Sequence, residues 1–291
     1  MENEPTQRFS KTLIKLTRLY LSLAIAFSAL AGHIFYSGSF KLTGFFVFAG
    51  VLLLSSGASA LNQYQERKAD ALMKRTRNRP LPSGKLSPQQ GLVIALIFCV
   101  SGILVLWLGT NLLTAGLGVF NLFWYNAVYT PLKRITSYVV LIGALTGAIP
   151  PLMGWTAAGG PFLGTEIWLV ALFMFLWQVP HFYLLLMKFG EEYEMAGFPS
   201  ITSQYSVRHV QIVTFLWIIG TSVSTLLFPF FNVLSSVSLI VGLVLMNTML
   251  ILFFCRITFS SKTPFTIRPA FRSLYLFQVI ILILLMAEAL K

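Results

Sequence analysis

Nine apolar stretches, each close to twenty residues long, constrain the fold of this chain more than any other feature of its sequence. A helix of about 20 apolar residues crosses the roughly 30 Å hydrocarbon layer of a bilayer and satisfies its own backbone hydrogen bonds there. Only 10% of the 291 residues are charged, against about 25% in soluble domains. The sequence therefore predicts an all-α membrane protein, one domain over residues 1–291, with transmembrane helices at 19–36, 44–61, 91–108, 112–129, 138–157, 166–187, 210–229, 233–255 and 274–289.

The basic residues fall almost entirely on one side of the predicted membrane. If the N-terminus is cytoplasmic, only Lys41 and Lys291 of the 21 Lys and Arg residues lie outside, as the positive-inside rule requires. We therefore expect a multi-pass protein of the cell inner membrane, with the lipid bilayer as a partner. The polar residues 1–18 lack the apolar core of a signal peptide. The net charge of +12 follows from this topology, so we expect no nucleic-acid partner.

Two of the predicted cytoplasmic connections, 62–90 and 188–209, are long, whereas the outer connections are short. Long connections inside a compact domain are usually functional. Five of the nine acidic residues lie in these two connections: Glu66, Asp70, Glu191, Glu192 and Glu194. They are therefore the first candidates for a functional site.

The first long connection begins with oxygen-bearing side chains at helical spacing. Asn62, Glu66 and Asp70 stand at positions i, i+4 and i+8, which places them on one face of a helix. Lys74 continues the series, and Pro80 and Pro82 are predicted to end the helix. Carboxylate and amide oxygens suit Mg²⁺, a hard cation that also binds substrate phosphates.

A basic cluster follows these oxygens. Arg75, Arg77 and Arg79 come directly behind the predicted face, and a guanidinium binds phosphate through two parallel hydrogen bonds. We expect Arg75 and Arg79 to bind a diphosphate. On this segment alone, a solvated cytoplasmic loop that obeys the positive-inside rule explains the charges equally well.

A second group of polar residues lies at 175–200. Lys188 and Glu192 are one helical turn apart, and His181 lies seven residues before Lys188, inside the sixth predicted span. Polar residues inside a membrane usually face a cavity and mark function. We weigh a ligand or catalytic role for His181 equally against a packed histidine bonded to a carbonyl group. His33, in the first span, is more readily explained as a packed residue.

Two further features of the sequence are a short basic segment and the two cysteines. The segment YNAVYTPLKRIT carries Lys133 and Arg134 on the same predicted side as the two long connections, although any short inner loop carries such residues. Cys99 and Cys255 have no spacing that indicates a metal site or a disulfide.

The combined motifs resemble the UbiA-type intramembrane prenyltransferases, and within them the branch that farnesylates heme. The resemblance rests on NQYQERKADALMKRTRNRPLPSG, YTPLKRIT, GALTGAIPPLMGW and WQVPHFYLLLMKFGEEYEMAGFP, and it covers roughly residues 55–215. Departures from that branch are Glu66 where the family usually has Asp, KLTRLY in place of a KPR element, and FPSITS where the family continues IPMLPV.

The resemblance implies nine helices around a central cavity, with a cytoplasmic cap formed by the 2–3 and 6–7 loops. It implies Mg²⁺-dependent transfer of a farnesyl group from farnesyl diphosphate to a vinyl group of heme b, and it allows a downstream heme-modifying membrane enzyme as a partner. By their positions, Asn62, Glu66 and Asp70 match the Mg²⁺–diphosphate motif, and Glu192 matches a carboxylate of the second motif.

Two basic positions complete the resemblance. Lys133 matches a residue that contacts the diphosphate, and Lys188 stands where other members carry a carboxylate. His181 is expected either to orient water or to bind iron.

The chemistry of prenyl transfer agrees with these residues, because diphosphate leaves only when its charge is neutralised and the allylic cation must be kept from bulk water. Two alternatives stay open at this point. One is prenylation of an aromatic quinone precursor by the same fold. The other is a non-catalytic membrane transporter or scaffold, against which stand the one-sided clustering of acids and bases and the absence of an internal repeat.

Overall fold

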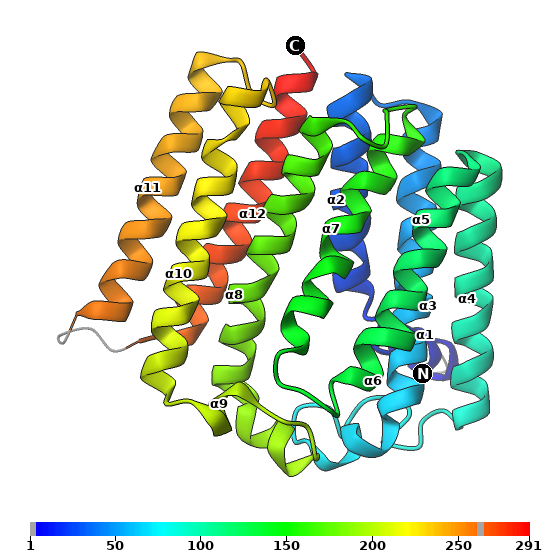
Figure 1. Cartoon of the computed structure of the whole chain (residues 1–291). Coiled ribbons are helices and arrows are strands. Elements are labelled where there is room, and N and C mark those ends of the chain that lie inside the picture. The colour runs from blue at the N-terminus through cyan, green and yellow to red at the C-terminus, as the bar shows by residue number, and fades with distance from the viewer. Residues whose placement is uncertain (1–3, 261–264) are drawn as a thin grey trace.

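The computed structural model describes residues 4–260 and 265–291, so Lys262, one of the basic residues assigned to the cytoplasmic side, lies outside it. Within the described residues every regular element is helical, and the long helices form one bundle (Figure 1). Eight helices are long and apolar enough to cross a membrane. They are α2 (Leu19–Ser37), α3 (Leu42–Leu72), α4 (Pro88–Gly109), α7 (Val139–Ala157), α8 (Thr165–Met195), α10 (Val207–Leu226), α11 (Val237–Phe259) and α12 (Ile267–Ala289).

The remaining apolar stretch, predicted as a span at 112–129, is helical but irregular. It forms α5 (Leu112–Phe123), the π-helix η1 (Trp124–Tyr129) and the short α6 (Thr130–Leu132), which follow one another without a break. A π-helical turn widens the backbone, and such turns are frequent at functional sites. This irregularity separates the segment from the eight regular helices.

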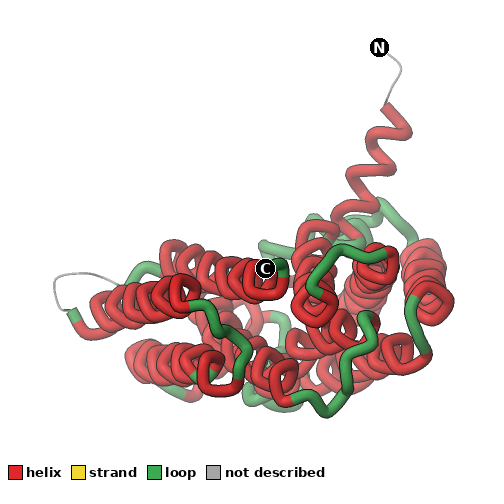
Figure 2. The backbone as a smooth tube through the Cα atoms, turned by 90° about the horizontal axis from the view of Figure 1, so that it is seen from above, coloured by secondary structure: helices red, strands yellow, loops and turns green. Residues whose placement is uncertain are grey.

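Three short elements lie at the ends of the bundle. The helix α1 (Glu4–Leu16) projects sideways from it (Figure 2). The others are α9 (Ile201–Gln204), which precedes α10, and the 3-10 helix η2 (Phe228–Phe231), which follows it.

Close helix packing depends on small residues, as is usual for membrane helices. A Cβ atom at Gly154 of α7 would collide with the Ala29 carbonyl oxygen of α2, and one at Gly32 would collide with the Pro151 carbonyl oxygen. Similarly, a Cβ at Gly57 of α3 would lie 2.7 Å from the backbone nitrogen of Cys99 on α4. These contacts bring the backbone of α2 close to that of α7 and the backbone of α3 close to that of α4.

The helices α3 and α8 are each 31 residues long and extend past the apolar spans at the same end of the bundle (Figure 1). There the two long connections meet, because Ala69 and Met73 share a buried apolar cluster with Phe198. The same packing places the polar end of α3 beside the end of α8.

One prediction about this region is wrong. The helix α3 ends at Leu72, and Met73 is extended, so neither Lys74 nor the prolines belong to that helix. Thr76 explains the earlier end, since its hydroxyl donates to the Asp70 carbonyl oxygen at 2.8 Å and its backbone N–H donates to the Met73 carbonyl. The chain therefore reverses direction just after Asp70.

Candidate functional site

A cavity of about 390 Å³ lies inside the bundle. Its walls come from α2, α3, α5 with η1, α7, α8 and α12, and its apolar part is lined by residues such as Leu54, Met153 and Met174. One end is strongly polar, and the side chains gathered there are Arg18, Asn62, Glu66, Asp70, Arg75, Arg79, Lys133 and Tyr193. The cavity thus combines an apolar body with a charged end.

The helix α3 supplies the oxygen atoms at this end. Asn62, Glu66 and Asp70 are 1%, 6% and 1% exposed, and all three line the cavity. The i, i+4, i+8 spacing accordingly forms a ladder along one face of α3, as the sequence predicts.

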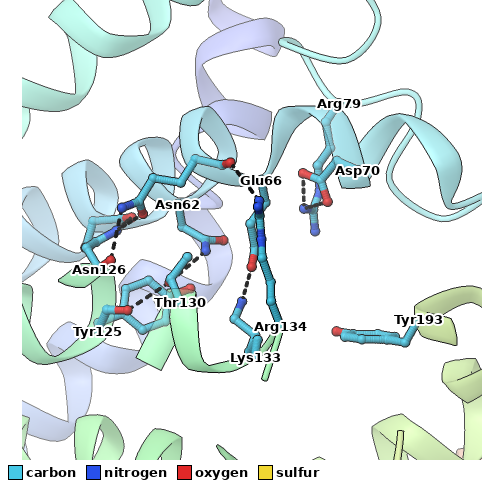
Figure 3. A network of polar contacts seen from close by, with 12 residues as sticks. Asn62, Glu66, Asp70, Arg79, Tyr125, Asn126, Thr130, Lys133, Arg134 and Tyr193 are labelled. Atoms are coloured by element: carbon cyan, nitrogen blue, oxygen red, sulfur yellow. Dashed lines mark hydrogen bonds and ion pairs between the residues drawn. The ribbon is translucent and has the colours of Figure 1, made fainter. Parts of the chain in front are cut away.

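Each carboxylate of the ladder has a cation beside it (Figure 3). The Nη1 atom of Arg79 lies 2.8 Å from Oδ1 and 2.7 Å from Oδ2 of Asp70. The Nζ atom of Lys133 lies 2.6 Å from Oε1 of Glu66. The turn after Met73 is what carries Arg79 back to Asp70, nine residues earlier in the chain. Burial and the nearby Arg18 lower the pKa of Arg79 to about 10, so it stays protonated near neutral pH.

The amide of Asn62 is oriented by hydrogen bonds on both sides. Its Nδ2 donates to Thr130 Oγ1 at 3.1 Å, and that hydroxyl donates to the Tyr125 carbonyl oxygen of η1 at 2.8 Å. Its Oδ1 accepts from Nη2 of Arg18 at 3.3 Å. The irregular helix η1 therefore has a direct part in positioning the ladder.

Arg18 is a site residue that sequence reasoning did not identify. It precedes α2 in a left-handed conformation, with φ 47° and ψ 49°, and its Nε is buried without a hydrogen-bond partner among the described residues. In the sequence it counts only as one more basic residue before an apolar span. Its position beside Asn62 arises from the packing of α2 against α3.

The rim of the cavity joins the two long connections. Glu192 Oε2 accepts from the Arg75 backbone N–H at 2.9 Å, and Arg75 Nη2 donates to the Tyr193 hydroxyl at 3.2 Å. Figure 3 shows Tyr193 facing the ladder from the opposite side. Lys188 is exposed, with its Nζ 4.8 Å from the centre of the Phe189 ring. Glu192 and Lys188 are thus at the rim and are absent from the described lining of the cavity.

His181 lies in the cavity wall among aromatic rings. The rings of Trp177 and Tyr275 are 5.5 Å and 5.2 Å from its own, and Phe271 and Phe182 complete the surround. Its Nδ1 is buried and has no hydrogen-bond partner in the described part of the chain. The carbonyl bond expected of a packed histidine is therefore missing at that nitrogen.

The two other histidines differ from His181. His33 is fully buried and its Nε2 lies 2.8 Å from Thr43 Oγ1, as the packed interpretation predicts. His209 is exposed and stacks on Tyr205. Neither lines the cavity.

The donor set at the polar end is suited to Mg²⁺ that is shared with a phosphate ligand. Among the described residues no three His, Cys, Asp or Glu side chains gather as a self-sufficient metal site. Mg²⁺ usually takes only one or two carboxylates and completes its shell with water and substrate phosphate oxygens. Glu66 Oε1 makes no hydrogen bond beyond the contact with Lys133. Glu66, Asp70 and the Asn62 amide therefore fit such a shared site.

Comparison with known proteins agrees with this geometry. Residues 20–277 match the UbiA prenyltransferase family. The protoheme IX farnesyltransferase of Geobacter sulfurreducens is 42% identical over 220 residues, which cover 76% of this chain and 81% of that protein. The mitochondrial protoheme IX farnesyltransferase of Homo sapiens is 41% identical over 209 residues, or 69% of this chain and 46% of the human protein.

Solved structures share the fold at low sequence identity. A digeranylgeranylglyceryl phosphate synthase superposes with a TM-score of 0.77 at 16% identity, over 97% of this chain and 98% of the other. A UbiA homolog from Archaeoglobus fulgidus bound to GPP and Mg²⁺ has a TM-score of 0.69 at 13% identity, over 96% and 98% of the two chains. These similarities concern the arrangement of the helices.

Proposed function

This chain belongs to the UbiA prenyltransferase family, and from that premise we propose that it transfers a farnesyl group from farnesyl diphosphate to a vinyl group of protoheme IX. Relatives at 41% and 42% identity bear the name of this reaction. One observation of the structure carries the proposal furthest. A buried ladder of oxygen donors, with a cation beside each carboxylate, closes the polar end of an otherwise apolar cavity.

The polar end is proposed to bind the diphosphate together with Mg²⁺, held by Asn62, Glu66 and Asp70. Bound Mg²⁺ would supply positive charge that weakens the bond to the leaving group. Arg79 and Lys133 now neutralise the carboxylates, and they can turn to the phosphate oxygens when the metal takes over that neutralising role. A UbiA homolog bound to GPP and Mg²⁺ supports this use of the fold.

The rim residues belong to the proposed site as well. Glu192 fixes the backbone of Arg75 beside the cavity, and Lys188 shares the Phe189 ring with the Arg75 guanidinium. We propose Arg75 and Lys188 as further diphosphate contacts and Glu192 as a further metal ligand. Closure of the two long connections over the substrate would bring all three inward.

The apolar body of the cavity is proposed to shield the reaction from water. When the farnesyl C1–O bond breaks, its electron pair leaves with the diphosphate, and the acceptor vinyl π-bond supplies the pair for the new C–C bond. The cation that remains on the former vinyl group takes a hydroxyl from one water molecule and releases a proton. The product is a hydroxyethylfarnesyl heme, heme O.

His181 is proposed to act on the acceptor side of the site. It lies on α8 seven residues, or roughly 10 Å along a helix, from the level of Lys188, within the cavity wall. Its unpartnered Nδ1 is available to orient the water, to accept the released proton or to bind the heme iron. Imidazole serves all three roles in proteins.

We also propose the finer topology. The helices α5, η1 and α6 run on without a break from residue 112 to 132, so they supply a ninth span for one inner-membrane domain with a cytoplasmic N-terminus. The joined long connections would then form a cytoplasmic cap over the site. The apolar product stays in the bilayer, where a downstream heme-modifying enzyme can receive it.

The proposal is tested with purified protein, farnesyl diphosphate and either heme b or 4-hydroxybenzoate. We expect diphosphate release and a heme O product by mass spectrometry only with heme b, and loss of both when EDTA removes Mg²⁺. Product with 4-hydroxybenzoate alone would identify the quinone alternative. No diphosphate release with either acceptor would favour the transporter or scaffold alternative.

A further inference from the structure

A second hollow lies outside the cavity, in the angle between α1 and α2. The helix α1 contributes Lys11, Ile14 and Lys15 to it, α2 contributes residues 19–21, and Arg18 forms the joint between them. Lys11 and Lys15 are one helical turn apart and both are exposed. The hollow, which we call the α1–α2 groove, therefore has a cationic wall and an apolar wall.

The joint of the α1–α2 groove is held in place by α3. Gln63 Nε2 donates to the carbonyl oxygens of Lys15 and Leu16 at 3.0 Å and 2.7 Å, and Leu16 is fully buried. These bonds satisfy carbonyl groups that a helix end leaves open. They lie just before Arg18, which has a left-handed conformation that is uncommon for a non-glycine residue. The helix α1 is thus set at a defined angle to the bundle (Figure 2).

The groove adjoins the cavity. Arg18 and Leu21 line both hollows, and the guanidinium of Arg18 also contacts the Asn62 end of the ladder. A ligand in the groove would therefore lie against a residue that also belongs to the polar end of the cavity.

Size and charge indicate what such a ligand is. The cavity of about 390 Å³ is near the lower end of the range of about 300–1,000 Å³ for pockets that hold a single ligand, which favours a separate place for at least part of a second substrate. The diphosphate has its own cations at the ladder. The acceptor also carries charge, two propionate carboxylates on the porphyrin edge away from its vinyl groups.

We propose that the α1–α2 groove binds the acceptor porphyrin, with Lys11 and Lys15 pairing with its two propionates. The apolar residues Ile14, Leu19 and Leu21 cover the macrocycle, and the ring of Tyr20, which is 81% exposed, lies beside it. This assignment rests on the proposed function, because it names how the acceptor of that reaction is recognised.

The test compares the Lys11→Ala/Lys15→Ala double variant with a matched Lys68→Ala/Lys85→Ala variant, which removes two exposed lysines elsewhere. The acceptors are heme b and its dimethyl ester, which lacks the carboxylates. Exposed ion pairs are individually weak, so we expect the loss of both lysines to raise KM for heme b about tenfold. Its kcat and its affinity for farnesyl diphosphate should be those of the wild type.

The dimethyl ester shows whether the lysines act on the propionates or on another ligand of the groove. For the wild type, esterification should raise KM by the same factor as the double variant, and the double variant should lose nothing further. A heme b titration followed at the Soret band should give the same ratios without turnover. An unchanged KM for heme b, an equal loss in the matched variant, or a loss of farnesyl diphosphate affinity would overturn the proposal.

Two further results would show that the lysines do not bind the propionates. If the double variant loses activity with the ester as well, the lysines do not act on propionates. If its defect disappears in nanodiscs of zwitterionic lipid that lack anionic lipid, the lysines bind anionic lipid headgroups and the proposal is wrong. Failure of the proposed function is seen separately, as a wild type that forms no heme O.

Discussion

Asp70 and Glu66 are buried carboxylates. Arg79, which lies beyond a turn, balances the charge of Asp70, and Lys133, which is far away in the sequence, balances that of Glu66. Removing one partner of a buried pair costs about 3–5 kcal/mol, because the other charge is left uncompensated. In the proposed function, Mg²⁺ would take the place of the cations beside the carboxylates, and the diphosphate would take the place of the carboxylates beside the cations. The pairing would therefore favour joint binding of Mg²⁺ and diphosphate over binding of either alone.

The Asp70→Asn substitution tests this arrangement. It keeps the shape of the side chain and removes its charge, so turnover should fall at least about 10²-fold, an electrostatic effect of a few kcal/mol. Turnover is measured on protein that elutes as a folded species, because Arg79 loses its partner. The control is Glu194→Gln, at an exposed acid. Full activity with an unchanged Mg²⁺ requirement would remove Asp70 from the metal site.

His181→Ala separates the donor and acceptor halves of the site. The histidine is surrounded by aromatic rings and lies away from the ladder, so farnesyl diphosphate affinity should persist while heme O formation is lost. Both quantities are measured on the same purified variant, with His209→Ala as the control at an exposed histidine. Lost diphosphate affinity would place His181 at the wrong end of the cavity, and normal product formation would leave it a packed residue.

At the scale of elements, the cavity depends on two different structural features. Small residues bring α2 against α7 and α3 against α4, as is usual for membrane helices. The second feature is η1, in which the Tyr125 carbonyl oxygen accepts from both the backbone N–H and the hydroxyl of Thr130, five residues later. In a regular α-helix that carbonyl would accept from the residue four positions later, so the π-helical turn places Thr130, whose hydroxyl accepts from the Asn62 amide.

Gly154→Ala should destabilise the α2–α7 wall. The added Cβ meets the Ala29 carbonyl oxygen, a backbone atom that cannot turn aside, and overpacking of this kind costs about 1–3 kcal/mol. We expect a lower Tm in a thermal unfolding assay in detergent. Gly116→Ala in α5 is the matched control, because nothing lies within 4 Å of its added Cβ, and its Tm should be unchanged or slightly higher. Equal Tm values for the two variants would contradict the close contact.

The whole molecule is polarised from one end to the other. The ladder, its cations and both long connections lie at one end of the bundle (Figure 1), whereas the cavity body is apolar. In the proposed function, a polar substrate head would therefore bind at the membrane surface while its prenyl chain stays in the hydrocarbon layer.

The proposed orientation gives a direct prediction. A reporter fused after Gly84 should be cytoplasmic and one fused after Gly160 should be on the other side, because nearly all basic residues then lie inside. Protease protection of the same fusions in sealed vesicles provides the second measurement. Both reporters on one side would show that the number of spans between them is wrong.

The sequence by itself determined the class of the protein and the oxygen donors of its site. Hydropathy and helical spacing are local properties, so the apolar spans and the common face of Asn62, Glu66 and Asp70 follow from residues a few positions apart. The family likewise follows from motifs that can be seen in the linear chain, and the match over residues 20–277 confirms it.

Only the tertiary structure decided which cation meets which oxygen. Lys133 reaches Glu66 from a different helix, Arg79 reaches Asp70 because Thr76 ends α3 early, and Arg18 reaches Asn62 from before α2. No local pattern encodes these contacts, because each depends on how separate segments of the chain pack together. The same packing places Lys188 and Glu192 at the rim of the cavity, whereas the resemblance had matched both to the diphosphate site.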